Sequence, residues 1–229
     1  MKKFTTFLLV ISFTFSFTSC SDNEVITEQS QEKLLKSFKL ERDASGRYSL
    51  DYEVADNTSA ISVKNIENKT NEIYLRNSDD VQQRAHTNEF MLDNNKLRIG
   101  LVDANTNKRA NISVEDENII LAKDNGDQFL STYSVKGNED GTYQLDFKVN
   151  KNVKVEFVYN ESIDTFEVHL SKGKGDDNQF SRALEISEKG TLNIDFVNHK
   201  GNQSRGYAFK EETRRKPRLA IGDGSELEG

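Results

Sequence analysis

The segment GRYSLDYEV at residues 46–54 decides the fold, because it recurs as GTYQLDFKV at residues 141–149. The second segment begins 95 residues after the first. When this offset is carried forward without a gap, 11 of the 30 positions in 46–75 are identical to their counterparts in 141–170. Internal similarity at a fixed spacing indicates a duplicated structural unit.

The extent of the duplication follows from the offset. We predict a first β repeat at 32–117, a connection at 118–126 and a second β repeat at 127–212. A charged segment at 213–229 follows, and it is predicted to be a disordered tail.

Each copy alternates apolar and polar residues with a period of two, the pattern of β-strands that bury one face. Tyr48, Leu50 and Val54 are predicted to face the core, as are their counterparts in the second copy. Gly46 and Gly141 are predicted to occupy turns with positive φ, which glycine adopts without strain.

About seven such runs in each copy predict an all-β protein. No convincing amphipathic helix is available to cover a sheet, so a second sheet must do so. We expect two tandem seven-stranded β-sandwich repeats of immunoglobulin-like size. The alternative is one continuous β-sandwich or barrel in which the two copies are halves related by a pseudo-two-fold axis.

Composition limits the class of partner. The 229 residues carry a net charge of -7, which argues against nucleic acid, because phosphate binding needs a basic surface. The single cysteine excludes a disulfide scaffold and a cysteine-cluster metal site. No nucleotide or cofactor motif is present, so we expect no cofactor.

The first 20 residues have the pattern of an export signal. Lys2 and Lys3 precede an apolar stretch at 4–17 that is too short to span a bilayer, and the stretch leads to Cys20. The sequence FTSC at 17–20 resembles the lipobox of bacterial lipoproteins, with Phe17 in place of leucine and Ser19 in place of glycine or alanine. An ordinary secretory signal is the alternative.

The resemblance implies that residues 1–19 form a lipoprotein signal peptide and that Cys20 is the site of lipid attachment. Residues 20–31 would then be a tether. The implied location is the outer membrane or cell surface of a diderm bacterium. Acidic residues directly after Cys20 resemble a surface-export signal. The membrane would be contacted through the lipid anchor only.

Candidate ligand positions are few. Asp51 and Asp146 lie at equivalent positions on the polar face of a strand, and they are candidates for ligand binding. Acidic turns could bind Ca²⁺ through oxygen ligands, although no EF-hand spacing is present. The candidate metal ligands in these turns are Asp124, Asp127, Asp176 and Asp177.

No catalytic constellation is recognisable. The histidines, His86, His169 and His199, are predicted in a loop, on a polar strand face and in a turn, and no serine-hydrolase or zinc motif accompanies them. We therefore expect a non-enzymatic lipoprotein that binds a glycan or a protein, or that acts as a scaffold for one. The alternatives are a surface hydrolase that uses paired carboxylates and an inhibitor or immunity lipoprotein.

Overall fold

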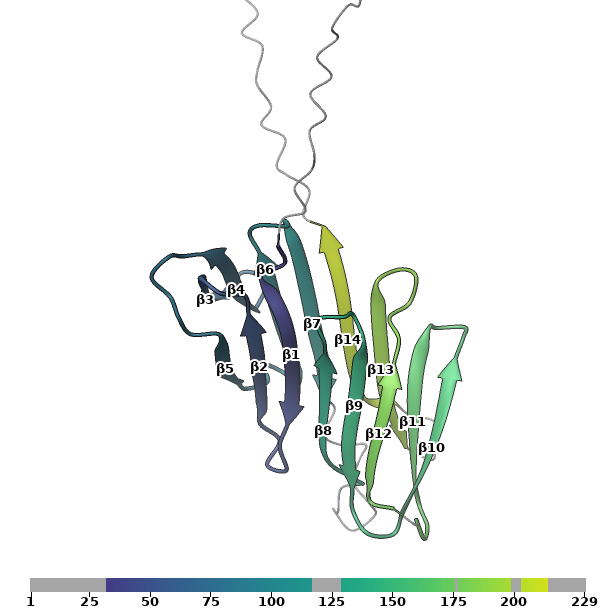
Figure 1. Cartoon of the computed structure of the whole chain (residues 1–229). Helices are drawn as coiled ribbons and strands as arrows, with labels where there is room; N and C mark the ends of the chain where they lie inside the picture. The colour runs from purple at the N-terminus through teal and green to yellow at the C-terminus, as the bar shows by residue number, and fades with distance from the viewer. Residues whose placement is uncertain (1–31, 117–128, 176, 199–202, 214–229) are drawn as a thin grey trace, which may run out of the picture. The chain divides into compact units, whose positions relative to one another are not determined.

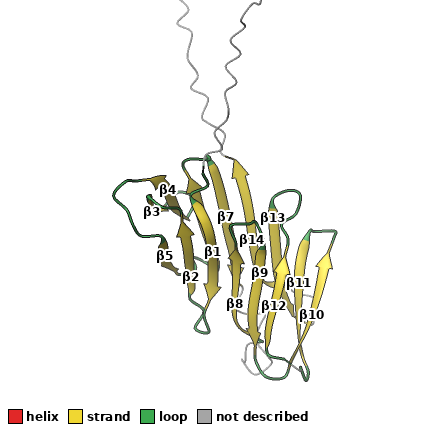
Figure 2. Ribbon diagram, viewed as in Figure 1, coloured by secondary structure: helices red, strands yellow, loops and turns green. Residues whose placement is uncertain are grey.

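The computed structural model describes residues 32–116, 129–175, 177–198 and 203–213. The chain divides into two units, Met1–Ser30 and Gln31–Gly229, and every described residue belongs to the second. All regular structure in this described part is β-strand, as Figure 2 shows. Within the same ranges there is no helix long and apolar enough to cross a membrane.

Fourteen strands are formed by the described residues. They are β1 (Leu35–Arg42), β2 (Tyr48–Val54), β3 (Thr58–Asn65), β4 (Thr70–Asn77), β5 (Ala85–Phe90), β6 (Lys96–Asp103), β7 (Lys108–Asp116), β8 (Leu130–Gly137), β9 (Tyr143–Val149), β10 (Val153–Asn160), β11 (Thr165–Lys172), β12 (Gln179–Leu184), β13 (Thr191–Asn198) and β14 (Gln203–Thr213).

The strands form two sheets that pack on one another (Figure 1). The six-stranded sheet has the order β12-β9-β8-β1-β2-β5, and the eight-stranded sheet has the order β10-β11-β13-β14-β7-β6-β4-β3. Neighbouring strands are antiparallel except for β4 with β6 and β11 with β13, which are parallel. The all-β sandwich predicted from the alternating pattern is confirmed.

The two copies have the same local structure. β1 begins at Leu35 and β8 begins at Leu130, an offset of 95 residues, and the same offset separates the first residues of β2 and β9. Gly46 and Gly141 have φ values of 89° and 83°, as the turn pattern predicts. Asn57 and its counterpart Asn152 also have positive φ, at 54° and 62°.

The copies share both sheets, and this corrects the expectation of two separate sandwiches. In the six-stranded sheet β1 pairs with β8, so that Leu40 lies opposite Val135. In the eight-stranded sheet β7 pairs with β14, so that Val114 lies opposite Tyr207. Each sheet reads as the same series of strands outward from its central pair, which is the arrangement of one continuous sandwich with pseudo-two-fold halves.

One hydrophobic core lies between the sheets. It contains Tyr48 and Leu50 from the first copy and Tyr143 and Leu145 from the second, all buried as predicted. The core is shared because the sheets themselves are shared: β1 and β8 pair with one another, and each also pairs with a strand of its own copy. Their backbone hydrogen bonds are therefore satisfied across the boundary between the copies.

Candidate functional site

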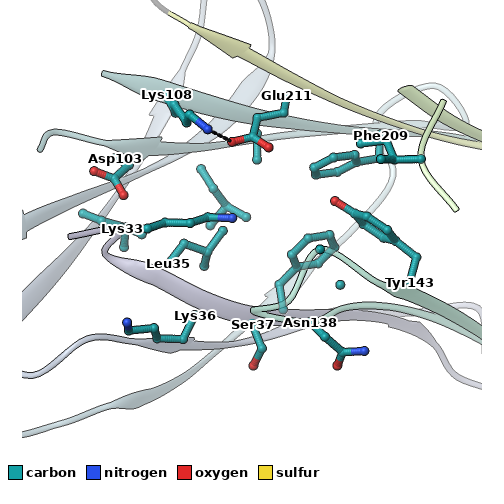
Figure 3. A pocket seen from close by; sticks show the side chains of 17 residues that line it. Lys33, Leu35, Lys36, Ser37, Asp103, Lys108, Asn138, Tyr143, Phe209 and Glu211 are labelled. Carbon is teal, nitrogen blue, oxygen red and sulfur yellow. Dashed lines mark ion pairs between the residues drawn. The ribbon is translucent and has the colours of Figure 1, made fainter. Parts of the chain in front are cut away.

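The candidate site is a pocket between the two sheets, at the end of the sandwich where β1 begins and β14 ends (Figure 3). The cavity has a volume of about 100 Å³. Side chains from both sheets form its apolar wall, and these are Leu35, Phe38, Leu75, Leu101, Ala110, Tyr143, Ile186 and Phe209. The pocket is thus an extension of the core toward the surface.

Three aromatic rings form one side of the pocket. The Phe38 and Phe209 rings stack with their centroids 5.5 Å apart, and the Tyr143 ring lies 5.2 Å from Phe209. Burial, followed by the charge of Glu211, raises the pKa of Tyr143 well above its ordinary value of 10.0. The Tyr143 side chain is therefore neutral at physiological pH, and this side of the pocket carries no charge.

Charged residues surround the mouth, and most of them have partners. The Asp103 carboxylate accepts hydrogen bonds from the backbone N–H groups of Leu34 at 2.7 Å and Asn105 at 2.9 Å. Lys108 Nζ lies 3.2 Å from Glu211 Oε1. Asp103 therefore holds the start of β1 in place, and Glu211 is neutralised by its neighbour.

The lysines on β1 and just before it differ in their surroundings. Lys36 Nζ lies 2.9 Å from Glu139 and 3.1 Å from Glu32, and these hydrogen bonds raise the pKa of Lys36. Lys33 forms no ion pair within the described residues. Figure 3 shows its side chain reaching into the pocket, with the ammonium group between Leu35 and Glu211 in that view.

The pseudo-symmetric position at the opposite end of the sandwich is filled. There Arg42 Nε lies 3.2 Å from Asp116 Oδ2, and the hydroxyl of Tyr48 donates to the same oxygen at 3.0 Å. Arg42 and Asp116 are only 2% and 1% exposed. A buried ion pair with a tyrosine hydrogen bond thus closes this end.

Sequence differences between the copies open the other end. By the offset of 95 residues, Gly137 is equivalent to Arg42. Glu211 is equivalent to Asp116, and Tyr143 is equivalent to Tyr48. A Cβ atom at Gly137 would lie 2.5 Å from Phe38 Cε1, so the glycine lets the Phe38 ring lie against β8. Leu101 takes the place of the buried Phe196. The Phe38 ring thus takes the place of the Arg42 side chain, the side chain at 101 is smaller than that at 196, and a cavity remains beside them.

Asp51 and Asp146 lie at equivalent positions on the polar face of the six-stranded sheet, away from this pocket. Asp51 Oδ1 accepts a hydrogen bond from Thr87 Oγ1 at 2.7 Å. Asp146 Oδ1 accepts one from Gln144 Nε2 at 3.0 Å. Each carboxylate therefore contacts a neighbouring side chain, and the two are not brought together.

The metal candidates gain no support from the described residues. Asp124, Asp127 and Asp176 lie outside them, as does Cys20, and Asp177 is exposed. Within the described ranges no group of three or more His, Cys, Asp or Glu side chains is arranged to hold a metal ion.

The histidines are not brought together either. His86 lies in β5 and not in a loop, and its ring stacks on Tyr52 with centroids 5.2 Å apart. Its Nε2 is buried and has no hydrogen-bond partner among the described residues. His169 lies on the other sheet, in β11, with Nε2 2.7 Å from Glu167. His199 is outside the described residues.

A second, more open hollow lies near the hairpin between β10 and β11. The Tyr159 ring, which is 48% exposed, lies 4.8 Å from the Phe166 ring, and its hydroxyl donates to Asp164 at 2.7 Å. Asn193 and Glu185 also line this groove. It therefore combines an exposed aromatic face with hydrogen-bonding groups.

The pocket residues were missed at the sequence level. The alternating pattern marks Phe38, Leu101 and Tyr143 as core positions, and a core position looks the same whether or not space remains beside it. Comparison of the two copies provides a signal. Gly137 is equivalent to Arg42, and Leu101 is equivalent to Phe196. These differences in side-chain size predict that equivalent places in the two halves are filled unequally.

Comparison with protein-family models, with curated proteins and with solved structures finds no match to this chain.

Proposed function

We propose that this chain is a lipid-anchored, non-enzymatic binding protein of the bacterial envelope, and that it takes up an apolar part of its partner in the pocket between the sheets. The observation that supports the proposal is the apolar cavity, open at one end of the sandwich while the equivalent place at the other end is filled. Sites for small ligands are concave and mostly apolar, with a few polar groups that orient the ligand.

The polar groups at the mouth favour binding over catalysis. Asp103 accepts backbone hydrogen bonds and Glu211 is paired with Lys108, so both carboxylates already have structural roles. An apolar side chain of a protein partner or the apolar part of a glycolipid would fit the walls.

The test is to isolate the native protein in mild detergent, extract it with organic solvent and identify bound molecules by mass spectrometry. A molecule present at about one per protein is expected. The change Leu101→Phe places in the pocket the ring that the second copy has at Phe196, and it should lower the amount of ligand bound. The matched control is Phe196→Leu, which makes the reverse exchange away from the pocket and should retain the ligand.

The result that contradicts the proposal is a native protein with nothing bound, or equal amounts of ligand in both variants. Circular dichroism on each variant separates loss of ligand from loss of fold.

The lipid anchor at Cys20 is proposed on the resemblance of residues 17–20 to a lipobox. Cells that express the protein should incorporate a labelled fatty acid into it, and Cys20→Ser should remove both the label and the membrane association. A Cys20→Ser protein that remains in the membrane fraction would rule out this anchor.

A glycan is the second candidate partner, and the groove beside Tyr159 favours it. Half-exposed aromatic rings next to carboxylate and amide groups offer a sugar both an apolar face and hydrogen bonds. Tyr159→Ala should weaken binding to an envelope glycan array, whereas Tyr74→Ala, on the first copy, should not. Equal binding by both variants would leave the pocket as the candidate site.

A further inference from the structure

We propose that the pocket holds the acyl chain of an anionic single-chain lipid taken from the adjoining membrane, with the chain between the sheets and its head group against Lys33. This inference deepens the proposed function and rests on it, since it names the chemical class of the ligand. Two observations support it, the walls and the charge at the mouth, and the anchor proposed at Cys20 adds the position of the mouth along the chain.

The walls select a flexible apolar group. The cavity of about 100 Å³ is smaller than the engineered cavity of about 150 Å³ that accepts benzene. It has room for roughly three or four methylene groups, which are similar in volume to a water molecule. The open side of the pocket lets a longer chain continue outward along Leu35 and Ile186.

The charge at the mouth selects an anionic head group. Asp103, Glu211, Lys36 and Lys108 are all engaged with neighbours, as described above. Among the described residues, Lys33 is therefore the one cation of the pocket lining without an ion pair, and its side chain reaches inward (Figure 3). A carboxylate or phosphate at this point would form a charge-assisted hydrogen bond with Lys33.

The position of the mouth places it near the membrane. Only 12 residues separate Cys20 from Lys33 in the sequence. Whatever their conformation, a chain of that length spans at most about 45 Å. When Cys20 carries its lipid, the mouth therefore lies within reach of the bilayer surface. Among the described residues, the buried pair of Arg42 and Asp116 fills the equivalent place at the opposite end.

The experiment titrates saturated fatty carboxylates of three to twelve carbons, below their micelle concentrations, into residues 20–229 carrying Cys20→Ser. Calorimetry gives the affinity, and NMR shifts at the amides of Gly137 and Ala110 locate the site. Affinity should rise about fourfold for each added methylene until the pocket is full, and then level off. The primary alcohol of equal length should bind up to about fivefold more weakly, because it cannot pair with Lys33.

Two variants and one control complete the test. Lys33→Glu should weaken the carboxylates about tenfold and leave the alcohols unchanged. Leu101→Phe should shorten the chain length at which affinity levels off. Lys64→Glu makes the same charge change at an exposed position on β3, outside the pocket, and should have no effect.

The outcomes are separable. If alcohols and carboxylates bind equally and Lys33→Glu has no effect, the anionic class is wrong while an apolar binding site remains. If affinity rises with chain length without levelling off and Leu101→Phe has no effect, the pocket is not the site. If removal of residues 214–229 raises the affinity more than tenfold, the occupant is a part of this protein, and the proposal of a membrane lipid is wrong.

Discussion

At the scale of single residues, the two ends of the sandwich show how a difference between equivalent residues of the two copies changes the local packing. Arg42 fills its place and pairs with Asp116, whereas Gly137 at the equivalent position lets the Phe38 ring lie against β8. A buried charge must be paired because solvation by water has been lost. The end closed by the ion pair is therefore sensitive to removal of either partner.

The first prediction concerns this ion pair. Asp116→Ala should lower the free energy of unfolding by about 3–5 kcal/mol, because Arg42 would stay buried without its partner. The control is Glu115→Ala, which removes the exposed partner of Lys96 on the same strand and should cost less than about 1 kcal/mol. Urea denaturation measures both. Equal losses in the two variants would contradict the assigned role of burial.

The second prediction concerns buried tyrosines. Burial raises the pKa of Tyr207 well above 10.0, and burial together with Glu211 raises that of Tyr143. A tyrosine whose pKa is higher in the folded state contributes stability below its unfolded pKa of about 10 and loses it as the pH rises further. The protein should therefore unfold progressively above about pH 10. Tyrosinate absorbance from these two residues should rise together with the loss of the β-sheet circular dichroism signal; absorbance that rises first would count against the prediction.

At the scale of elements, the alternating pattern predicts where strands lie but not which strands pair. Tyr48, Leu50 and Val54 would face a core equally well in a separate sandwich or in a shared one. In the structure β1 pairs with β8, but period-two alternation only indicates which face of a strand is buried and does not indicate which strand lies beside it. This is why the sequence predicts the strand positions and the core residues. It does not distinguish two separate sandwiches from one continuous sandwich.

Hydrogen exchange provides the test at this scale. The backbone amides of β1 and β8, at the centre of the six-stranded sheet, should exchange only through global unfolding. Amides of the edge strands β5 and β12 should exchange faster, because each of these strands has one neighbour. Fast exchange confined to the boundary between β1 and β8 would show that the copies open independently.

At the scale of the whole molecule, the shared core means that the core side chains of each copy need contacts from the other copy. Phe38 from the first copy packs on Tyr143 and Phe209 from the second. Tyr48 packs on Tyr133 in the same manner, with ring centroids 6.2 Å apart. Each half therefore supplies part of the interior of the other.

Fragment complementation follows from this arrangement. Residues 32–117 and residues 127–229, produced separately, should lack cooperative thermal unfolding, because each would expose β1 or β8 and one face of the core. Mixing the fragments should restore a cooperative transition close to that of the full chain. A cooperative transition in either fragment alone would show that the copies are independent domains.

The candidate site was the part least accessible to sequence reasoning. Asp51 and Asp146 are candidates for ligand binding because they are polar and repeated, yet each forms a hydrogen bond with a neighbouring side chain. The pocket instead depends on a difference between the copies, at Gly137 and Leu101, combined with a packing arrangement that only the structure supplies.

The pairing of β1 with β8 and of β7 with β14 has a consequence for assembly. The first half of one molecule offers a second molecule the same partner surface that its own second half occupies. At high concentration during refolding, two chains can therefore exchange halves through the segment between Asp116 and Phe129, giving an intertwined dimer with two intact sandwiches. Dilution before refolding would favour the monomer.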